Sequence, residues 1–282
     1  MEASLRINRG SFQSTRGKTF SYEDYITDEN DFPILFLHGW QSSPRFYHAL
    51  VRNLDDSGIR CILIELDMEE KDASPASLKS TSNQHAIDIQ DLLEHLDIDE
   101  FGLLAFSMFG GSIAHRLAML ALERLKFLIL LSPGPCLIDS TPRHVFWNML
   151  PDDIKSDILE LDGDFLNSII NKVAHFIQDG LKSRSSKNGS KAFIVEDLKK
   201  MIEEVNFVKD FDPGSNKFIT DIPVQIICGE LDEFIPPVLS YKVSRIFKEI
   251  FFQVIPFGGH YFPLDFPGET ARLIKEFLEK IM

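Results

Sequence analysis

Residues 101–111 read FGLLAFSMFGG. The first six form an unbroken apolar run, which is typical of a short strand buried on both faces of a sheet. A serine follows at once, and the two glycines after it open an amphipathic stretch over residues 110–123 that predicts a helix. The segment therefore predicts a buried strand, a sharp turn that presents Ser107, and a helix that packs on the sheet.

The same alternation of apolar runs and amphipathic stretches extends in both directions along the chain. Runs typical of buried strands lie at residues 33–37, 61–66, 127–131, 224–228 and 251–255. Stretches with helical spacing of apolar residues lie at residues 44–56, 82–96, 238–247 and from 267 onward. Polar and apolar residues alternate at 5–8 and 18–27, which predicts a leading antiparallel hairpin. The order predicts an α/β fold, in which helices cover both faces of a mostly parallel sheet.

The strand–helix alternation stops between residues 136 and 216. This segment is amphipathic throughout, apart from a polar loop at residues 182–191 that reads KSRSSKNGSK. A helical insertion between two strands of one sheet is most simply a lid. We therefore expect one core domain, made of residues 1–135 and 217–282, and a lid made of residues 136–216.

Composition and charge limit the possible partners. The chain has 282 residues, 44% of them hydrophobic, and a formal net charge of −14. This charge repels nucleic acids and anionic membrane surfaces. The first ten residues lack the apolar core of a signal peptide, and no run approaches the roughly 20 apolar residues of a membrane span. We expect a cytoplasmic protein with a small-molecule substrate; the sequence sets no oligomeric state.

The three cysteines are Cys61, Cys136 and Cys228. They are too few and too scattered for a disulfide framework or a metal site. Cys61 and Cys228 fall within predicted strands, where a thiol behaves as a small buried apolar group. We expect neither a metal nor a cofactor.

Four motifs follow predicted strands in a fixed order along the chain. They are His38-Gly39-Trp40, Leu104-Ala105-Phe106-Ser107-Met108, Cys228-Gly229-Glu230-Leu231-Asp232 and Gly258-Gly259-His260. In this order they resemble the α/β-hydrolase family, and the resemblance covers most of the chain. It implies an α/β-hydrolase fold with a helical lid, in which Ser107 is the nucleophile, Asp232 the acid and His260 the base.

The chemistry explains why these residue types occur together. A serine hydroxyl is a weak nucleophile until a histidine accepts its proton, and a carboxylate orients that histidine. The oxyanion of the tetrahedral intermediate needs two donors, which by position are the backbone N–H groups of Trp40 and Met108. We expect His38 and Gly39 to shape the oxyanion loop, His38 by hydrogen bonding.

The turn around the serine departs from the usual pattern, small-x-Ser-x-Gly. Phe109 is the second residue after the serine, and the glycines come one residue late, at Gly110 and Gly111. Alignment on the glycines would put Met108 at the nucleophile position and predict an inactive protein. Alignment from the upstream strand places Ser107 there instead, and we prefer it because strand length fixes where the turn can form. The structural alternative is that Ser107 only caps the following helix.

Other carboxylates compete with Asp232 for the acid role. Glu230 and Glu233 flank it, and we expect both to be solvated. A second acid position, after the sixth strand of the sheet, would select Asp139. The acidic loop at residues 67–72 either favours cationic or neutral substrates or is simply a solvated surface loop.

We predict a serine hydrolase of the carboxylesterase type that cleaves a small or medium apolar ester through an acyl-enzyme. The side chains expected to contact substrate are Phe106, Phe109, Phe146 and Trp147. Within the same fold, thioesterase, C–C hydrolase, lactonase, acyltransferase, perhydrolase and cofactor-free lyase or oxygenase activities stay open. A non-catalytic binding or scaffold protein is the alternative outside enzymology, suggested by the unusual turn.

Overall fold

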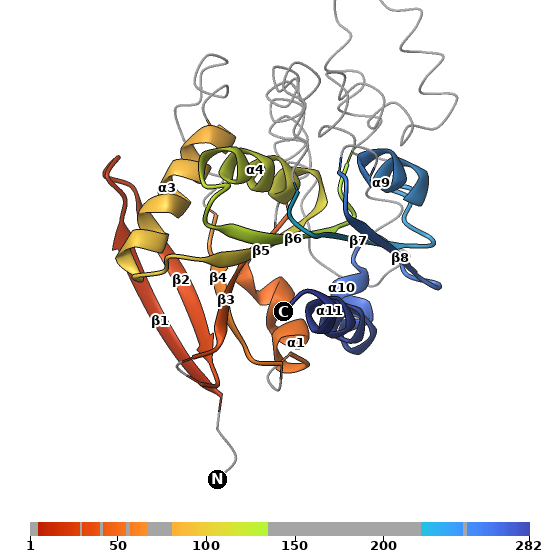
Figure 1. The fold of residues 1–282 in the computed structure, drawn as a ribbon, viewed down its shortest axis with the longest axis horizontal. Coiled ribbons are helices and arrows are strands. Elements are labelled where there is room, and N and C mark those ends of the chain that lie inside the picture. The colour runs from red at the N-terminus through yellow and green to blue at the C-terminus, as the bar shows by residue number, and fades with distance from the viewer. Residues whose placement is uncertain are drawn as a thin grey trace, which may run out of the picture.

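A twisted sheet runs through the centre of the molecule in the computed structural model (Figure 1). The structure describes residues 5–28, 30–39, 42–54, 57–66, 81–134, 221–244 and 247–282. Within these ranges the sheet has eight strands in the order β1-β2-β4-β3-β5-β6-β7-β8. This order places β5, which carries the serine turn, in the interior of the sheet.

The strands lie close to their predicted positions. They are β1 (Arg6–Gln13), β2 (Thr19–Ile26), β3 (Phe32–Leu37), β4 (Ile59–Ile64), β5 (Phe101–Phe106), β6 (Leu125–Leu131), β7 (Val224–Gly229) and β8 (Ile250–Ile255). β2 pairs with β1 and β4 in antiparallel fashion, and β3 to β8 form the parallel part. The predicted leading hairpin and the mostly parallel α/β sheet are confirmed.

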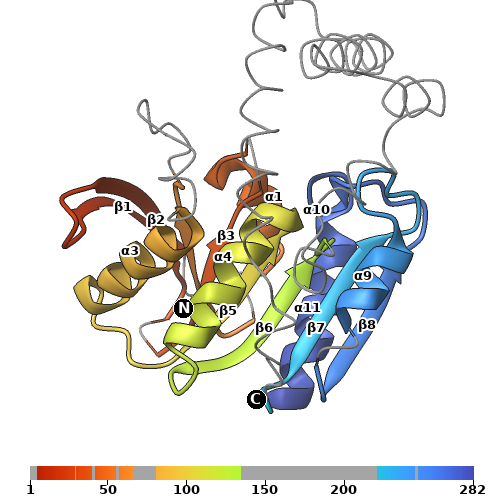
Figure 2. The same ribbon diagram turned by 90° about the horizontal axis from the view of Figure 1, so that it is seen from above.

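Helices cover both faces of the sheet. They are α1 (His48–Arg52), α3 (Thr81–His95), α4 (Ser107–Leu120), α9 (Pro237–Ser244), α10 (Phe262–Asp265) and α11 (Pro267–Ile281), with a 3₁₀ helix η1 (Pro44–Tyr47) before α1. α3, α4 and α9 lie on one face, and α1, α10 and α11 lie on the other (Figure 1). Seen from above, the first three lie in front of the strands and α11 lies behind them (Figure 2).

Strand β5 supplies side chains to both halves of the core. Leu103 and Ala105 belong to the hydrophobic cluster under α3 and α4, whereas Leu104 and Phe106 belong to the cluster under α1 and α11. Successive side chains of a strand point to opposite faces, so an unbroken apolar run is what a strand buried on both sides requires. This double burial fixes the end of β5, and with it the position of the residue that follows.

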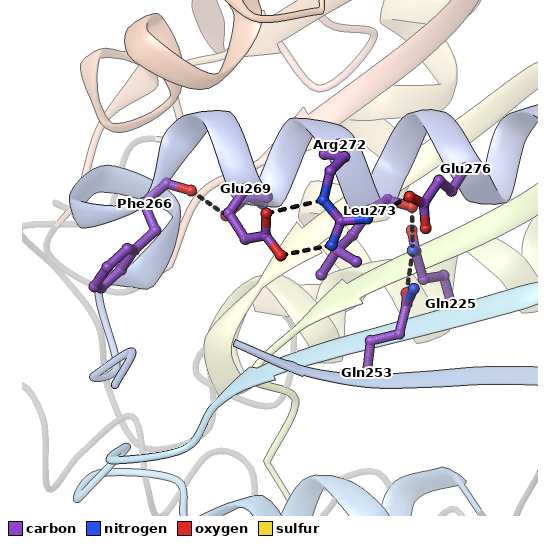
Figure 3. Close-up of polar contacts among 8 residues, drawn as sticks. Gln225, Gln253, Phe266, Glu269, Arg272, Leu273 and Glu276 are labelled. Carbon is purple, nitrogen blue, oxygen red and sulfur yellow. Dashed lines mark hydrogen bonds and ion pairs between the residues drawn. The ribbon is translucent and has the colours of Figure 1, made fainter. Parts of the chain in front are cut away.

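The last helix, α11, is tied to the far edge of the sheet by buried amides (Figure 3). Gln225 of β7 donates from Nε2 to the Leu273 carbonyl at 2.8 Å and to Gln253 Oε1 of β8 at 2.6 Å. On the exposed side of the helix, Arg272 forms a bidentate ion pair with Glu269 at 2.9 and 2.6 Å. The contacts of Gln225 join β7 to β8 and to α11, and both strands precede loops of the site.

The bounds of several predicted helices differ from those in the structure, among them the helix at 238–247, which spans Pro237–Ser244. The stretch at 44–56 is a 3₁₀ turn followed by a short α-helix that ends at Arg52. Tyr47, at the junction of the two, is fully buried, and its hydroxyl donates to the Leu37 carbonyl at 2.9 Å. The helix expected at 110–123 already begins at Ser107 and ends at Leu120. In the part of the chain that the structure describes, no helix has the length and apolar character needed to cross a membrane.

Candidate active site

Ser107 lies at the junction of β5 and α4. Its backbone has a φ of 63°, in the left-handed region that residues other than glycine rarely adopt. A residue held in such a conformation costs about 1–3 kcal/mol, which the surrounding packing must offset. The result is a sharp strand-to-helix turn that puts the serine at the carboxyl edge of the sheet and at the amino end of a helix.

The late glycine has a structural reason. A Cβ atom added to Gly110 would lie 2.9 Å from the Leu37 carbonyl oxygen and 3.0 Å from that of His38, so α4 approaches the end of β3 at this residue. Phe109 instead points into the core, where its ring meets His85 of α3 edge-on at 6.0 Å. The glycine is therefore needed at the third residue after the serine, and the second is free to be large.

Ser107, His260 and Asp232 form one hydrogen-bonded chain. His260 Nε2 lies 3.1 Å from Ser107 Oγ, and His260 Nδ1 lies 2.8 Å from Asp232 Oδ2. A carboxylate can only accept, so the proton between the last two belongs to Nδ1. Nε2 then keeps its lone pair toward the serine hydroxyl, which is the tautomer that a general base needs.

The Asp232 carboxylate receives hydrogen bonds at both oxygens. Oδ1 accepts from the backbone N–H groups of Phe234 at 3.0 Å and Ile235 at 2.7 Å. Oδ2 accepts from Ser132 Oγ at 2.6 Å in addition to His260. These donors fix the orientation of a carboxylate that is only 3% exposed. Nothing in the sequence marked Ser132, apart from its place directly after β6.

A contact between two glycine-containing loops brings the acid and the histidine together. A Cβ atom on Gly229 would lie 2.3 Å from the Gly258 carbonyl oxygen and 2.5 Å from that of Gly259. The N–H of Leu231 also donates to the Gly258 carbonyl at 2.8 Å. The loop after β8 can therefore pack directly on the end of β7. This contact includes Gly259, the residue before His260.

The two competing glutamates lie elsewhere. Glu233 is exposed, as predicted. Glu230 is also exposed, but its Oε2 accepts the N–H of Phe257 at 2.9 Å, so the expectation of a merely solvated side chain was incomplete. Phe257 has a φ of 59°, and this hydrogen bond supports the turn that leads to His260. No contact links either glutamate to the histidine among the described residues.

Aromatic rings surround the imidazole of His260. The ring centroids of Phe106, Phe234 and Tyr261 lie 4.9, 5.3 and 5.3 Å from that of the histidine. Phe106 is 1% exposed and also stacks on Phe46 at 4.5 Å. Such packing limits rotation of the imidazole and leaves it 8% exposed. Phe234 and Tyr261 were missed from the sequence, although both are neighbours of predicted site residues.

His38 links the loops that follow β3 and β4. Its Nε2 accepts the N–H of Leu66 at 3.0 Å, so its proton lies on Nδ1, which donates to the Gly39 carbonyl at 2.8 Å. Burial lowers the pKa of this imidazole. A neutral ring at 3.8 Å from Glu65 forms no ion pair with it. His38 therefore hydrogen-bonds to both loops, and its role in shaping an oxyanion loop stays a prediction. Gly39 packs against Phe106 and Ser107.

Several expected site residues lie outside the described residues. They are Trp40, Asp139, Phe146, Trp147, the acidic loop at 67–72 and the lid at 136–216. Met108 is described, and its side chain packs on Ile235 and Leu239, so Ser107 and not Met108 faces the histidine. Phe106 and Phe109 are buried in the core, and their role in substrate binding stays a prediction.

Metal ligands do not gather anywhere in the described ranges: no group of three or more His, Cys, Asp or Glu side chains has the required arrangement. Cys61 and Cys228 are free and buried, as predicted. Burial raises the pKa of the Cys228 thiol to about 12, and the Asp232 carboxylate adds to this effect. A thiol of this kind stays protonated and is a poor nucleophile.

Comparison with known proteins places this geometry in a family. A family model described as the alpha/beta hydrolase fold matches residues 33–267. A Bacillus subtilis (strain 168) protein named as a candidate 2-succinyl-6-hydroxy-2,4-cyclohexadiene-1-carboxylate synthase is 25% identical over 263 residues, which cover 88% of this chain and 90% of that protein. The sn-1-specific diacylglycerol lipase ABHD11 of Danio rerio is 23% identical over 286 residues, covering 97% of this chain and 88% of the lipase.

Solved structures agree on the fold. A thermophilic esterase from Thermogutta terrifontis superimposes with a TM-score of 0.64 at 20% sequence identity, covering 97% of this chain and 99% of the esterase. The family match also confirms the sequence-based prediction of a hydrolase-type enzyme. The chain belongs to the alpha/beta hydrolase fold family.

Proposed function

We propose that the protein is a serine hydrolase of the carboxylesterase type, which cleaves a small or medium apolar ester through an acyl-enzyme. The observation that carries the proposal is the continuous chain from Asp232 through His260 to Ser107, with contacts of 2.8 and 3.1 Å. A helix-capping serine would need no buried histidine beside its hydroxyl. A scaffold protein would need no buried carboxyl group hydrogen-bonded behind that histidine.

Each group has a role that follows from its position. Ser107 Oγ attacks the ester carbonyl while His260 Nε2 accepts its proton, and Asp232 stabilises the resulting imidazolium. His260 then gives the proton to the leaving alcohol, which leaves Ser107 acylated. Water, deprotonated by the same imidazole, releases the acid. The N–H of Met108, at the amino end of α4, and that of Trp40 would stabilise the oxyanion.

The substrate is expected to be apolar at its acyl end. The segment at 136–216, which we take as the lid, is rich in Phe, Leu and Ile, and Phe146 and Trp147 are the side chains we assign to the pocket. Burial of three extra methylenes contributes about 2.4 kcal/mol, which corresponds to about fiftyfold in kcat/KM. p-Nitrophenyl butyrate and hexanoate should therefore be better substrates than the acetate.

A second reaction class draws on the Bacillus subtilis relative, whose name is that of a synthase. In a cofactor-free reaction of the lyase type, His260 would be the base and Ser107 would only bind the substrate. Such an enzyme would not form an acyl-enzyme. The two proposals therefore differ in whether the serine oxygen becomes covalently modified during turnover.

Hydrolysis of p-nitrophenyl esters by matched serine variants tests the proposal. Ser107→Ala should lower kcat for the butyrate by about 10³-fold or more, as loss of a triad nucleophile does. The control is Ser112→Ala on the same helix, since Ser112 is buried and donates only to the Phe109 carbonyl at 2.8 Å. Retention of more than about a tenth of the wild-type rate by Ser107→Ala would reject the nucleophile. Acetate as the best substrate of the series would reject an apolar acyl pocket.

A further inference from the structure

We infer that Ser132 is a positioning residue for Asp232, and that its hydroxyl holds the acid in the orientation that His260 needs. The inference rests on the proposed function, because it concerns the same three catalytic groups. Ser132 directly follows β6, a strand that contributes no other residue to the hydrogen-bonded site in the described part of the chain. Its hydroxyl is the only side-chain donor to Asp232 there besides His260.

Backbone contacts fix the position of Ser132 independently of its hydroxyl. Its backbone N–H donates to the Ile227 carbonyl of β7 at 2.8 Å, and its φ is 45°, in the left-handed region. The residue is fully buried. A side chain held in this way has little freedom to turn elsewhere, so its oxygen lies 2.6 Å from Asp232 Oδ2 as a preorganised donor.

The target oxygen explains what this donor can do. The backbone N–H groups of Phe234 and Ile235 fix Oδ1 of Asp232. If only Oδ1 were held, the carboxylate could still pivot on this atom and move Oδ2 away from the imidazole. Ser132 removes this freedom, because it binds the same Oδ2 that accepts from His260. A charge-assisted O–H···O⁻ contact of this length is among the strong hydrogen bonds of proteins.

The hydroxyl of Ser132 donates to Asp232 and not to Ser107, so we expect it to act through the acid. Ser132→Ala should therefore lower kcat for p-nitrophenyl butyrate by about tenfold and leave KM within a factor of two. The matched control is Ser240→Ala: Ser240 is equally buried, and its hydroxyl donates at 3.1 Å to the carbonyl of Pro133, the residue next to Ser132. Ser240→Ala should leave both constants within a factor of two.

A double-mutant cycle separates positioning from a general structural role. The readout is the second-order rate constant with which a fluorophosphonate probe labels Ser107, since labelling needs no turnover and can be followed for hours in slow variants. Ser132→Ala should slow labelling about tenfold in the wild-type background. In the Asp232→Ala background the same change should alter the rate by less than twofold, because the group that Ser132 positions is gone.

Equal slowing in both backgrounds, or no slowing in the wild type, would overturn the assignment of Ser132. Should Ser132→Ala melt well below the wild type, Ser132→Gly repeats the cycle without backbone strain, since glycine adopts a positive φ freely. A wild type that the probe does not label at all would reject the proposed function, and the role of Ser132 with it. Labelling of the wild type together with a failed cycle rejects the role of Ser132 alone.

Discussion

Replacement of Gly229 by alanine should separate the acid from the histidine without touching either. The new Cβ would lie 2.3 Å from the Gly258 carbonyl oxygen, whereas an ordinary van der Waals contact begins at 3.4 Å. The loop after β8 must therefore retreat by about 1 Å. A shift of that size stretches the 2.8 Å contact between His260 and Asp232 beyond hydrogen-bond length.

The expected cost of Gly229→Ala follows from this displacement. A misplacement of about 1 Å lowers catalysis by about 10²-fold, and overpacking of a tight contact costs about 1–3 kcal/mol of stability. Both are measurable, as kcat/KM for p-nitrophenyl butyrate and as the free energy of unfolding in urea. Gly259→Ala is the control, because a Cβ atom at Gly259 has no heavy atom within 4 Å.

Gly259→Ala should keep at least a third of the wild-type kcat/KM and lose less than 1 kcal/mol of stability. The argument fails if Gly229→Ala keeps wild-type activity, or if the control variant is the more damaged of the two. Either result would mean that the contact between the two loops does not set the distance from His260 to Asp232.

Three further predictions concern the acid, the serine turn and acid stability. Asp232→Asn should lower kcat about 10⁴-fold, whereas Glu230→Gln should lower it less than tenfold, and comparable losses in steady-state assays would speak against Asp232 as the acid. Phe109→Gly should keep ester hydrolysis within tenfold but lower the free energy of unfolding by about 3–5 kcal/mol, because a buried ring is lost. Loss of activity in a folded variant would show instead that the ring supports the turn. Burial lowers the pKa of His85 to about 3 and that of His115 to about 4, below the value near 6.5 of an unfolded chain. The native state therefore keeps its full stability above about pH 6.5, where both histidines are neutral. As the pH falls from 6.5 toward 4, each histidine lowers the free energy of unfolding by about 1.4 kcal/mol per pH unit. Urea unfolding at pH 7 and pH 5 measures this slope, and a slope unchanged in His85→Phe would contradict the assignment.

The interior strands were predictable because their burial is visible in the sequence. The six residues of β5 are all buried, and the predicted and observed bounds agree. The register of the serine turn was harder to predict, because its glycine comes one residue late. Only the structure explains this spacing, through the contact between Gly110 and the end of β3. The sharp turn and the residue that it presents could be predicted, but the reason for the late glycine could not.

Ser132 and Glu230 show where sequence reasoning ends. Ser132 donates to a residue 100 positions away. The pairing of β6 with β7 brings the two residues together, and no local sequence pattern predicts this contact. Glu230 was expected to be solvated because spacing from the strand end favoured Asp232 as the acid, yet it supports a turn 27 positions later. The resemblance of four ordered motifs to the α/β-hydrolases led to the prediction of Ser107, Asp232 and His260, whereas their supporting contacts depend on the tertiary arrangement.

The central claim is that Ser107 is a nucleophile activated by His260. Wild-type protein treated with a fluorophosphonate probe, digested and mapped by mass spectrometry tests this claim most directly. The account predicts one adduct, on Ser107, in the peptide that contains the end of β5 and the start of α4. An unmodified Ser107 under conditions that label a known serine esterase, or an adduct on a different serine, would contradict it.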